Sequence, residues 1–276
     1  MKYYYYPKLS HLDFGIIRSP GPGLGNLLFP IARCISKFNK YKSTSEMIYP
    51  TIPQIKLGTL IRQEKSKRFY FKEFRGRTLK EWYKWSKFNF YKYVFNKNNK
   101  VKIISEYNLG NYFYDFYDDK HLIFNWIKNN MSEKISLQSR KKNKIGIHIR
   151  RGDFIKKEKN SDHQNQTNFQ VEDTWYINCV QKLLEGDHNI DEIVIFTDSK
   201  KIDDLIKIFN VFVPTKLDQS KTDIGSLVSL SNCKYIVCSQ STFSMWAAYL
   251  GNSKCIWPFN FELSKYLKIE ARYKFM

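Results

Sequence analysis

The second half of the chain alternates between short apolar runs and longer amphipathic runs. Runs of branched and aromatic residues predict strands, and apolar positions three or four residues apart predict helices. The expected strands are Ile145–Ile149, Glu192–Thr197, Val211–Val213, Tyr235–Cys238 and Lys254–Trp257. The expected helices are Val171–Leu184, Lys201–Phe209, Thr222–Asn232 with Thr222 or Asp223 as its cap, and Thr242–Leu250. This order predicts a parallel sheet with right-handed crossovers, in which the apolar run Glu192–Thr197 is covered on both faces.

The first half has a less regular pattern. The expected strands are Phe14–Arg18 and Ser45–Tyr49, and the expected helices are Asn26–Phe38 and His121–Lys128. The polar, lysine-rich segment Ser132–Lys144 is the expected linker. We therefore expect an α/β fold of two Rossmann-like domains that face a cleft, residues 1–140 and residues 141–276, with the more regular parallel sheet in the C-terminal half.

Composition places the chain in a reducing compartment. No apolar run is long enough to cross a membrane, and the N-terminus has no signal-peptide pattern. The cysteines are odd in number and lack CxxC spacing, so we expect them to be buried apolar residues and neither metal ligands nor disulfides. They are Cys34, Cys179, Cys233, Cys238 and Cys255. These features predict a cytoplasmic protein.

The net charge of +20 favours an acidic partner, and much of it is concentrated in residues 56–102. This segment has fifteen Lys and Arg residues against three acidic residues, and many aromatic residues lie among them. Such a pattern is typical of a surface for anionic lipid or for single-stranded nucleic acid, and also of a lysine-rich surface over an aromatic core. Nucleic acid is disfavoured because no recognised binding module accompanies the charge. Peripheral contact with the inner face of the cytoplasmic membrane stays open.

Polar segments follow three predicted strands at their carboxyl ends. They are His148–Asp153, Thr197–Ser199 and Ser239–Ser244. The carboxyl ends of parallel strands meet at one edge of the sheet, where open α/β sheets bind ligands. Paired arginines match phosphate geometry, and a helix start offers backbone N–H groups to an anion. The three segments together predict a diphosphate site, although taken singly each also fits a surface ion pair or a helix cap.

A glycine-containing loop, Gly23-Leu-Gly-Asn26, precedes the first predicted helix. It resembles part of a dinucleotide-binding fingerprint but lacks the third glycine, so it is weak evidence by itself. The chain contains no HExxH, no GxSxG and no P-loop. Of its adjacent acid pairs, Asp118-Asp119 precedes a predicted helix and Asp203-Asp204 lies on the surface of one, so neither pair indicates a metal site. A catalytic metal is therefore disfavoured.

These segments, in this order, resemble the α-1,2-fucosyltransferases (glycosyltransferase family 11). The resemblance is carried by His148-Ile-Arg-Arg-Gly-Asp153, Ile195-Phe-Thr-Asp198, the long block Asp223–Leu250 and the loop Gly23–Phe29. It leaves residues 45–140 effectively unmatched. It implies a GT-B-like fold, in which residues 1–140, with the glycine loop and the basic aromatic region, form the acceptor-side domain and residues 141–276 form the GDP-sugar-binding domain. It also implies a metal-independent, inverting transfer of L-fucose from GDP-fucose to a sugar hydroxyl, with galactoside O-2 on a surface glycan or lipid-linked oligosaccharide as the expected acceptor.

The resemblance also assigns roles by position. Arg150 would hold the β-phosphate and stabilise the departing GDP, Arg151 would support the same loop, and Asp153 is the motif's candidate general base. His148 and Asp198 would contact the guanosine portion. The other expected donor-binding residues are Ser239, Gln240, Ser241, Thr242, Phe243, Gly23, Gly25 and Asn26. No metal ligand and no cofactor beyond the donor substrate is implied.

Several residues depart from the family pattern. Leu27 and Pro30 replace common glutamines, Ser199 replaces an acid, and Gln240 and Met245 replace Asn and Trp. These departures put the acceptor and the donated sugar in doubt, and leave another GDP-6-deoxyhexose such as GDP-colitose as an alternative donor. A non-catalytic nucleotide-sugar-binding or RNA-binding protein is the alternative from a different class.

Overall fold

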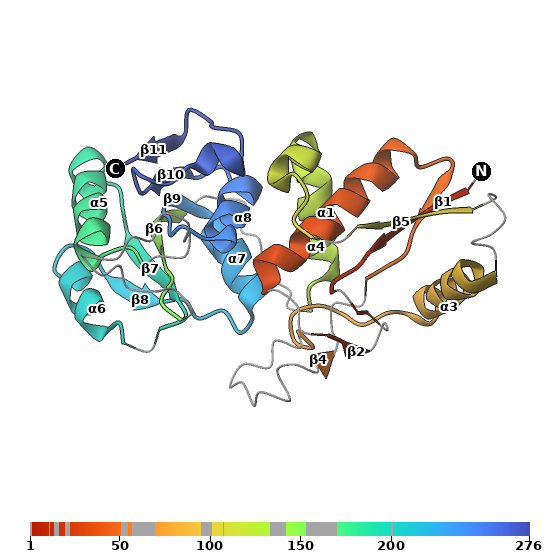
Figure 1. The fold of residues 1–276 in the computed structure, drawn as a ribbon. Coiled ribbons are helices and arrows are strands. Elements are labelled where there is room, and N and C mark those ends of the chain that lie inside the picture. The colour runs from red at the N-terminus through yellow and green to blue at the C-terminus, as the bar shows by residue number, and fades with distance from the viewer. Residues whose placement is uncertain are drawn as a thin grey trace, which may run out of the picture. The chain divides into compact units, whose positions relative to one another are not determined.

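The computed structural model describes residues 2–10, 12–13, 17–19, 23–50, 55–56, 70–94, 101–106, 108–132, 142–152, 170–199 and 201–276. The chain divides into two compact units, Met1–Lys134 and Ile135–Met276, so the division lies inside the expected linker (Figure 1). Both units are α/β and contain parallel sheets, which confirms the predicted fold class. The cleft between the domains stays a prediction, as do the acceptor-side role of the first half and the donor-binding role of the second.

The N-terminal unit is built around a three-stranded parallel sheet in the order β3-β1-β5. These strands are β1 (Lys2–Pro7), β3 (Ser45–Met47) and β5 (Val101–Glu106), and a separate parallel pair joins β2 (Ile17–Arg18) to β4 (Ile55–Lys56). Its helices are α1 (Leu24–Lys40), α3 (Leu79–Val94), the 3-10 helix η1 (Tyr112–Asp119) and α4 (Lys120–Asn130). The expected helices therefore extend one or two residues further at their ends.

Strand β1 consists largely of tyrosines and is the central strand of this sheet. Tyr4 and Tyr6 pack against Phe88 of α3, with ring centroids 6.3 and 5.3 Å apart. Tyr5, between them, is also buried, and α1 contacts β1, β3 and β5. Because the successive residues Tyr4, Tyr5 and Tyr6 are all buried, polar and apolar residues do not alternate along β1. The period of two that predicts a strand is therefore missing from its sequence.

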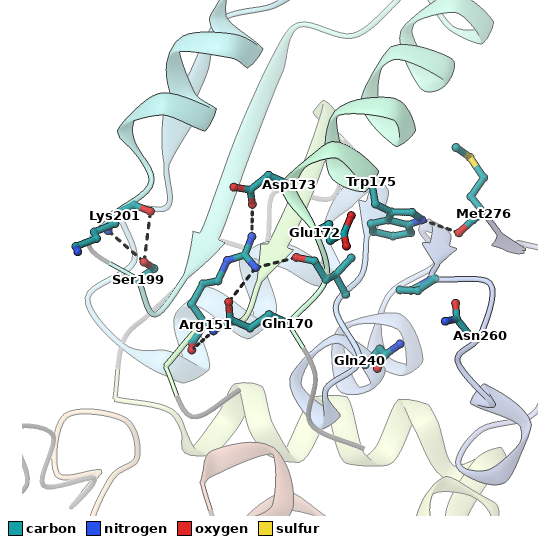
Figure 2. Close-up of a pocket in the computed structure, with 12 residues that line it drawn as sticks. Arg151, Gln170, Glu172, Asp173, Trp175, Ser199, Lys201, Gln240, Asn260 and Met276 are labelled. Atoms are coloured by element: carbon teal, nitrogen blue, oxygen red, sulfur yellow. Dashed lines mark hydrogen bonds and ion pairs between the residues drawn. The ribbon is translucent and has the colours of Figure 1, made fainter. Parts of the chain in front are cut away.

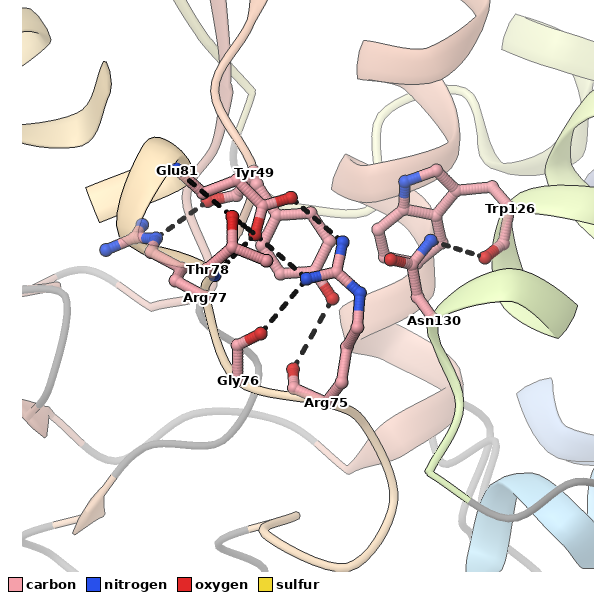
Figure 3. A network of polar contacts seen from close by, with 8 residues as sticks. All are labelled: Tyr49, Arg75, Gly76, Arg77, Thr78, Glu81, Trp126 and Asn130. Atoms are coloured by element: carbon pink, nitrogen blue, oxygen red, sulfur yellow. Dashed lines mark hydrogen bonds and ion pairs between the residues drawn. The ribbon is translucent and has the colours of Figure 1, made fainter. Parts of the chain in front are cut away.

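Helix α3 begins in the basic aromatic segment with a capping box. Thr78 Oγ1 accepts a hydrogen bond from the Glu81 amide at 3.3 Å, and the Glu81 carboxylate accepts one from the Thr78 amide at 2.8 Å. Arg75 adds two parallel hydrogen bonds to Glu81, both 2.8 Å long, as Figure 3 shows. Arg77 lies beside this network, where its Nε donates to the carbonyl of Tyr49. Part of the local positive charge thus has a structural role.

The C-terminal unit contains a six-stranded parallel sheet in the order β11-β10-β9-β6-β7-β8. The strands are β6 (Lys142–Ile149), β7 (Glu192–Thr197), β8 (Thr215–Leu217), β9 (Cys233–Val237), β10 (Lys254–Trp257) and β11 (Tyr273–Phe275). The helices are α5 (Asp173–Gly186), α6 (Asp203–Asn210), α7 (Asp223–Ser231), α8 (Thr242–Leu250) and the 3-10 helix η2 (Leu263–Lys265). This confirms the more regular parallel sheet expected in this half.

The two faces of β6 pack against different helices. Ile145, Ile147 and Ile149 are fully buried in a cluster with residues of α5 and α6. Gly146 faces the other way, because a Cβ there would stand 2.7 Å from Leu230 Cδ1 of α7. Figure 1 shows α5 and α6 on one side of the sheet and α7 and α8 on the other. The pleat of β6 therefore sends alternate side chains toward different helix layers.

One predicted strand is wrong. Val211–Val213 forms the turn that ends α6, where the Val213 amide donates to the carbonyl of Phe209 at 3.1 Å. Val211 is 80% exposed, so its apolar side chain does not contribute to the core. The strand β8 begins two residues later, at Thr215, after Pro214. The apolar composition of these three residues is typical of a strand. Their backbone amides instead donate to carbonyls of the last turn of α6, and these hydrogen bonds determine their conformation.

All five cysteines are buried and none forms a disulfide, as expected. In the part of the chain that the structure describes, no helix combines the length and the apolar character needed to cross a bilayer.

We expect Glu81→Gln to loosen the start of α3 at neutral pH. Burial alone would raise the pKa of the Glu81 carboxyl, but hydrogen bonds from Arg75 and Thr78 lower it from 4.5 to about 2. The carboxylate therefore stabilises the fold above pH 4.5, and this contribution is lost as the pH falls toward about 2. Because the site is partly exposed, its loss costs about 1 kcal/mol, or about fivefold in hydrogen-exchange protection of the first-turn amides of α3.

The control is Glu262→Gln, which removes an exposed ion pair with Lys265 in the C-terminal unit and should leave that protection unchanged. The stabilising role of the Glu81 charge is wrong if Glu81→Gln matches the native protein at pH 7, or if the difference between them stays constant as the pH is lowered.

Candidate active site

The carboxyl ends of β6 and β9 lie at the point where the order of the C-terminal sheet reverses. From β6 the chain proceeds outward through β7 to β8, and it then returns to place β9 on the other side of β6. Counted along this unit, the strand order is 6-5-4-1-2-3, the order of doubly wound dinucleotide-binding sheets, which bind ligands at this reversal. The segments Arg150–Gly152 and Ser239–Ser244 follow these two strands. The topology therefore brings together two of the three segments that the sequence singles out, and Asp198 follows the neighbouring strand β7.

His148 and three serine hydroxyls form a buried cluster at this point. His148 Nδ1 lies 2.7 Å from Ser244 Oγ, 2.9 Å from Ser239 Oγ and 3.3 Å from Ser241 Oγ. Ser239 Oγ also lies 3.0 Å from Ser241 Oγ, and the Ser239 amide donates to Ser244 Oγ at 3.1 Å. These contacts fix the turn after β9 against the end of β6. Ser244 ends the predicted segment Ser239–Ser244 but was given no role of its own, although its position three residues after the cap Ser241 was a readable signal.

The imidazole of His148 is held neutral. Burial lowers the pKa of His148 from 6.5 to about 3, and the nearby Arg150 guanidinium contributes to this shift, while Asp198 opposes it. A neutral ring has one donor and one acceptor nitrogen, so it bonds the hydroxyl cluster without adding charge. The ring of Phe243 lies against it, with centroids 4.8 Å apart. His148 therefore shapes the site as a neutral hydrogen-bonding group.

Asp198 organises the turn after β6. Its Oδ1 accepts from the Arg151 amide at 2.8 Å, and its Oδ2 accepts from the Gly152 amide at 3.1 Å. The same Oδ2 pairs with Arg150 Nη1 at 2.7 Å. A Cβ on Gly152 would stand 2.5 Å from this oxygen, which explains the glycine. The contacts that Asp198 makes in the structure are thus with the arginine turn.

The side chain of Arg151 lies toward the start of α5. Its Nη1 donates to the Val171 carbonyl at 2.7 Å, and its Nη2 pairs with Asp173. Gln170 Nε2 returns a hydrogen bond to the Arg151 carbonyl at 3.0 Å, as Figure 2 shows. Arg151 is therefore tied to the segment before α5, whereas its neighbour Arg150 is tied to Asp198. The two adjacent arginines do not form one fork.

The start of α8 presents backbone amides next to the hydroxyl cluster. Ser241 caps the helix by accepting from the Ser244 amide at 3.3 Å. Within the described residues, the amides of Thr242 and Phe243 make no hydrogen bond, as is usual in a first helical turn. The first turn contains no acidic residue, so the positive end of the helix dipole is not offset there. This helix start suits an anion.

The glycine loop precedes α1 in the N-terminal unit. Gly23 is the N-cap residue and makes no side-chain cap, and Gly25 and Asn26 lie in the first turn, which has no acidic residue. Asn26 Oδ1 is buried and has no hydrogen-bond partner among the described residues. Asp153 lies outside the described residues. Among those that are described, no three His, Cys, Asp or Glu side chains gather as a metal site.

No curated protein matches the chain, and two solved structures resemble it distantly. POFUT1 in complex with GDP is similar with a TM-score of 0.49 at 10% identity, over 91% of this chain and 96% of that chain. The fucosyltransferase NodZ from Bradyrhizobium is similar with a TM-score of 0.43 at 11% identity, over 90% of this chain and 92% of that chain.

The sequence pattern of glycosyl transferase family 11 matches residues 38–275, which is most of the chain and includes all three segments of the candidate site. The protein belongs to glycosyl transferase family 11.

Proposed function

We propose that the protein transfers L-fucose from GDP-fucose to a sugar hydroxyl, with inversion and without a metal ion. The expected acceptor is O-2 of a galactoside on a surface glycan or a lipid-linked oligosaccharide. Family membership supports the transfer of a sugar. The observation that carries the proposal is the position of Arg150 at the carboxyl end of β6, beside the reversal of the sheet and the start of α8.

Arg150 and the α8 amides suit a diphosphate for different reasons. The guanidinium supplies a fixed positive charge and five N–H donors, of which Nη1 holds Asp198. The amides of Thr242 and Phe243 supply uncharged donors at the positive end of a helix. Because His148 stays neutral, the phosphate charge would be balanced by Arg150 and would not be shared with an imidazolium.

The transfer breaks the bond between fucose C1 and the β-phosphate oxygen. The electron pair of that bond stays on the oxygen, so the leaving GDP gains negative charge as the bond lengthens. The acceptor oxygen forms the new bond to C1 from the opposite face, and its proton passes to a base or to water. Donors that contact the leaving phosphate act more strongly in the transition state than in the ground state, which is the condition for raising kcat.

Asp198 and Arg151 would act as positioning residues in this scheme. Asp198 holds Arg150 and two successive amides of the turn, so it sets where the guanidinium points. Arg151 anchors the same turn to the segment before α5. Gly23, Gly25 and Asn26 remain the expected contribution of the N-terminal unit, because the first turn of α1 has no side-chain cap. Asp153 stays the motif's candidate base.

Arg150→Ala should lower kcat/KM for GDP-fucose at least about 100-fold, the usual effect of removing one charged donor from a leaving group. Arg150→Lys should recover part of the loss, because it restores the charge without the paired donors. Initial rates of GDP release with and without acceptor measure the effect. The control is Lys207→Ala, which removes an exposed cation that pairs with Asp204 on α6. Turnover within about threefold of the native rate in Arg150→Ala would exclude the clamp.

Chelation and donor choice test the remaining parts of the proposal. Transfer should continue in excess EDTA at an unchanged rate, because Arg150 and the α8 amides take the role that a cation plays in metal-dependent enzymes. GDP-fucose should be preferred to other GDP-sugars under the same conditions. A rate that collapses in EDTA and returns with Mg²⁺ contradicts metal independence. Faster transfer from GDP-colitose would instead identify that sugar as the donor.

Peripheral contact with an anionic membrane is proposed for the outward face of α3. Its exposed residues between 79 and 90 follow a helical spacing, and all but Ser86 are apolar or basic, namely Leu79, Lys80, Tyr83, Lys87 and Phe90. Between residues 79 and 90, no exposed acid interrupts this face. Such a helix binds headgroups by charge and by insertion of its apolar residues.

The double substitution Lys80→Glu, Lys87→Glu should abolish co-flotation with vesicles that contain one-third phosphatidylglycerol, whereas Lys207→Glu on α6 should not affect it. Equal flotation of both variants would exclude this surface.

A further inference from the structure

Strand β8 lies at one edge of the C-terminal sheet, where it pairs with β7 alone. The Pro214 carbonyl and the Asp218 amide each form a 2.9 Å hydrogen bond to β7. Alternate residues of a strand direct their backbone groups to opposite sides, so those of Thr215 and Leu217 point away from β7. The Thr215 amide donates to Asn210 Oδ1 at 2.7 Å. Both backbone groups of Leu217 stay available, because no further strand pairs with this edge in the described part of the chain.

An apolar patch lies beside this edge, on the face of the sheet that α6 covers. Its members are Ile208, Val211, Phe212 and Leu217, which are 39%, 80%, 41% and 42% exposed. The first three follow the spacing i, i+3 and i+4 along α6 and the turn that ends it, so they lie on one side of that helix. Leu217 is in register with Ile195, which is buried in the same core cluster as residues of α6, so both side chains point to this face. Figure 1 shows α6 and β8 together at this end of the sheet. Exposed apolar residues beside an open strand edge mark an interaction surface.

The charged residues on either side of Leu217 make the edge complementary to itself. The Asp218 carboxylate accepts hydrogen bonds from two serine hydroxyls, at 2.9 and 2.5 Å, and no cation pairs with it among the described residues. Lys216 pairs with Glu192 at 2.6 Å, and its side chain is still half exposed. When two copies of β8 pair antiparallel about Leu217, Lys216 of each copy lies opposite Asp218 of the other. Opposite charges at directly facing positions stabilise a strand pair, and like charges there destabilise it.

We propose that β8 pairs antiparallel with β8 of a second copy of this chain, about a twofold axis beside Leu217, and so joins two six-stranded sheets in a dimer. In this register the two Leu217 residues exchange both N–H···O=C hydrogen bonds, and the apolar patches of the two copies cover each other. A second copy fits better than an unrelated strand, because one short segment supplies the donor, the acceptor, the cation and the anion. A twofold interface requires such self-complementarity. The inference is independent of the proposed function.

Sedimentation velocity of the whole protein, at concentrations from about 1 to about 100 μM, should show a monomer–dimer equilibrium. Val211→Lys should raise the dimer dissociation constant at least about tenfold, because it places a charge inside the apolar patch. Lys216→Glu should have a similar effect, because two carboxylates then face each other on each side of the axis. The matched control is Ile269→Lys, which changes a half-exposed apolar residue before β11, at the other edge of the sheet. Thermal melting of each variant checks that the fold is intact.

A cross-link tests the register directly and does not depend on weakening the protein. In the proposed pair the Cα atoms of the two Leu217 residues are about 5.5 Å apart, which suits a disulfide. The five native cysteines are buried, so Leu217→Cys adds one exposed thiol. Mild oxidation with copper phenanthroline should convert this variant to a covalent dimer, whereas Ile269→Cys should stay monomeric on a non-reducing gel. The inference is overturned by a native protein that stays monomeric at about 100 μM, by a dimer that both charge substitutions leave unchanged, or by equal cross-linking of the two cysteine variants.

Discussion

The carboxylate of Asp198 is the contact on which the candidate site depends. It connects the end of β7 to the turn after β6 through the Arg150 guanidinium and through the amides of Arg151 and Gly152. Charged hydrogen bonds of this kind are roughly twice as strong as neutral ones. Since a Cβ at position 152 would collide with this carboxylate, the contact of Asp198 with the turn requires a glycine there. A turn held at three points keeps its cation in one orientation before any ligand arrives.

The hydroxyl cluster fixes the turn after β9, on the other side of the sheet reversal, as Asp198 fixes the turn after β6. Ser239, Ser241 and Ser244 surround one nitrogen of His148, and all come from a single turn and the helix start behind it. The environment keeps the imidazole uncharged, so β6 and β9 are joined by neutral hydrogen bonds. Positive charge at this edge is therefore concentrated in the arginine turn. Preorganised groups of this kind need little rearrangement when charge develops nearby.

Much of the C-terminal unit was predictable because it is periodic. The residues of β7, β10 and α8 were predicted without error, since continuous apolar runs and a serine cap have few alternative conformations. The N-terminal unit was less accessible. Its central strand is a run of tyrosines, and α3 lies in a stretch where lysine and aromatic residues obscure the helical period. The capping box of Thr78 and Glu81 was a local signal there, and it was overlooked.

The partners of the two arginines could not be read from the sequence. The motif predicted that Arg150 and Arg151 act in one place, yet in the turn after β6 their side chains have different partners, Asp198 for Arg150 and the segment before α5 for Arg151. A single inserted or deleted residue in β6 would shift this turn by one position. One partner would then face the other arginine, and the second partner would face Gly152 or Ile149 in place of a guanidinium. The length of β6 therefore matters to the site as much as the identity of its two arginines.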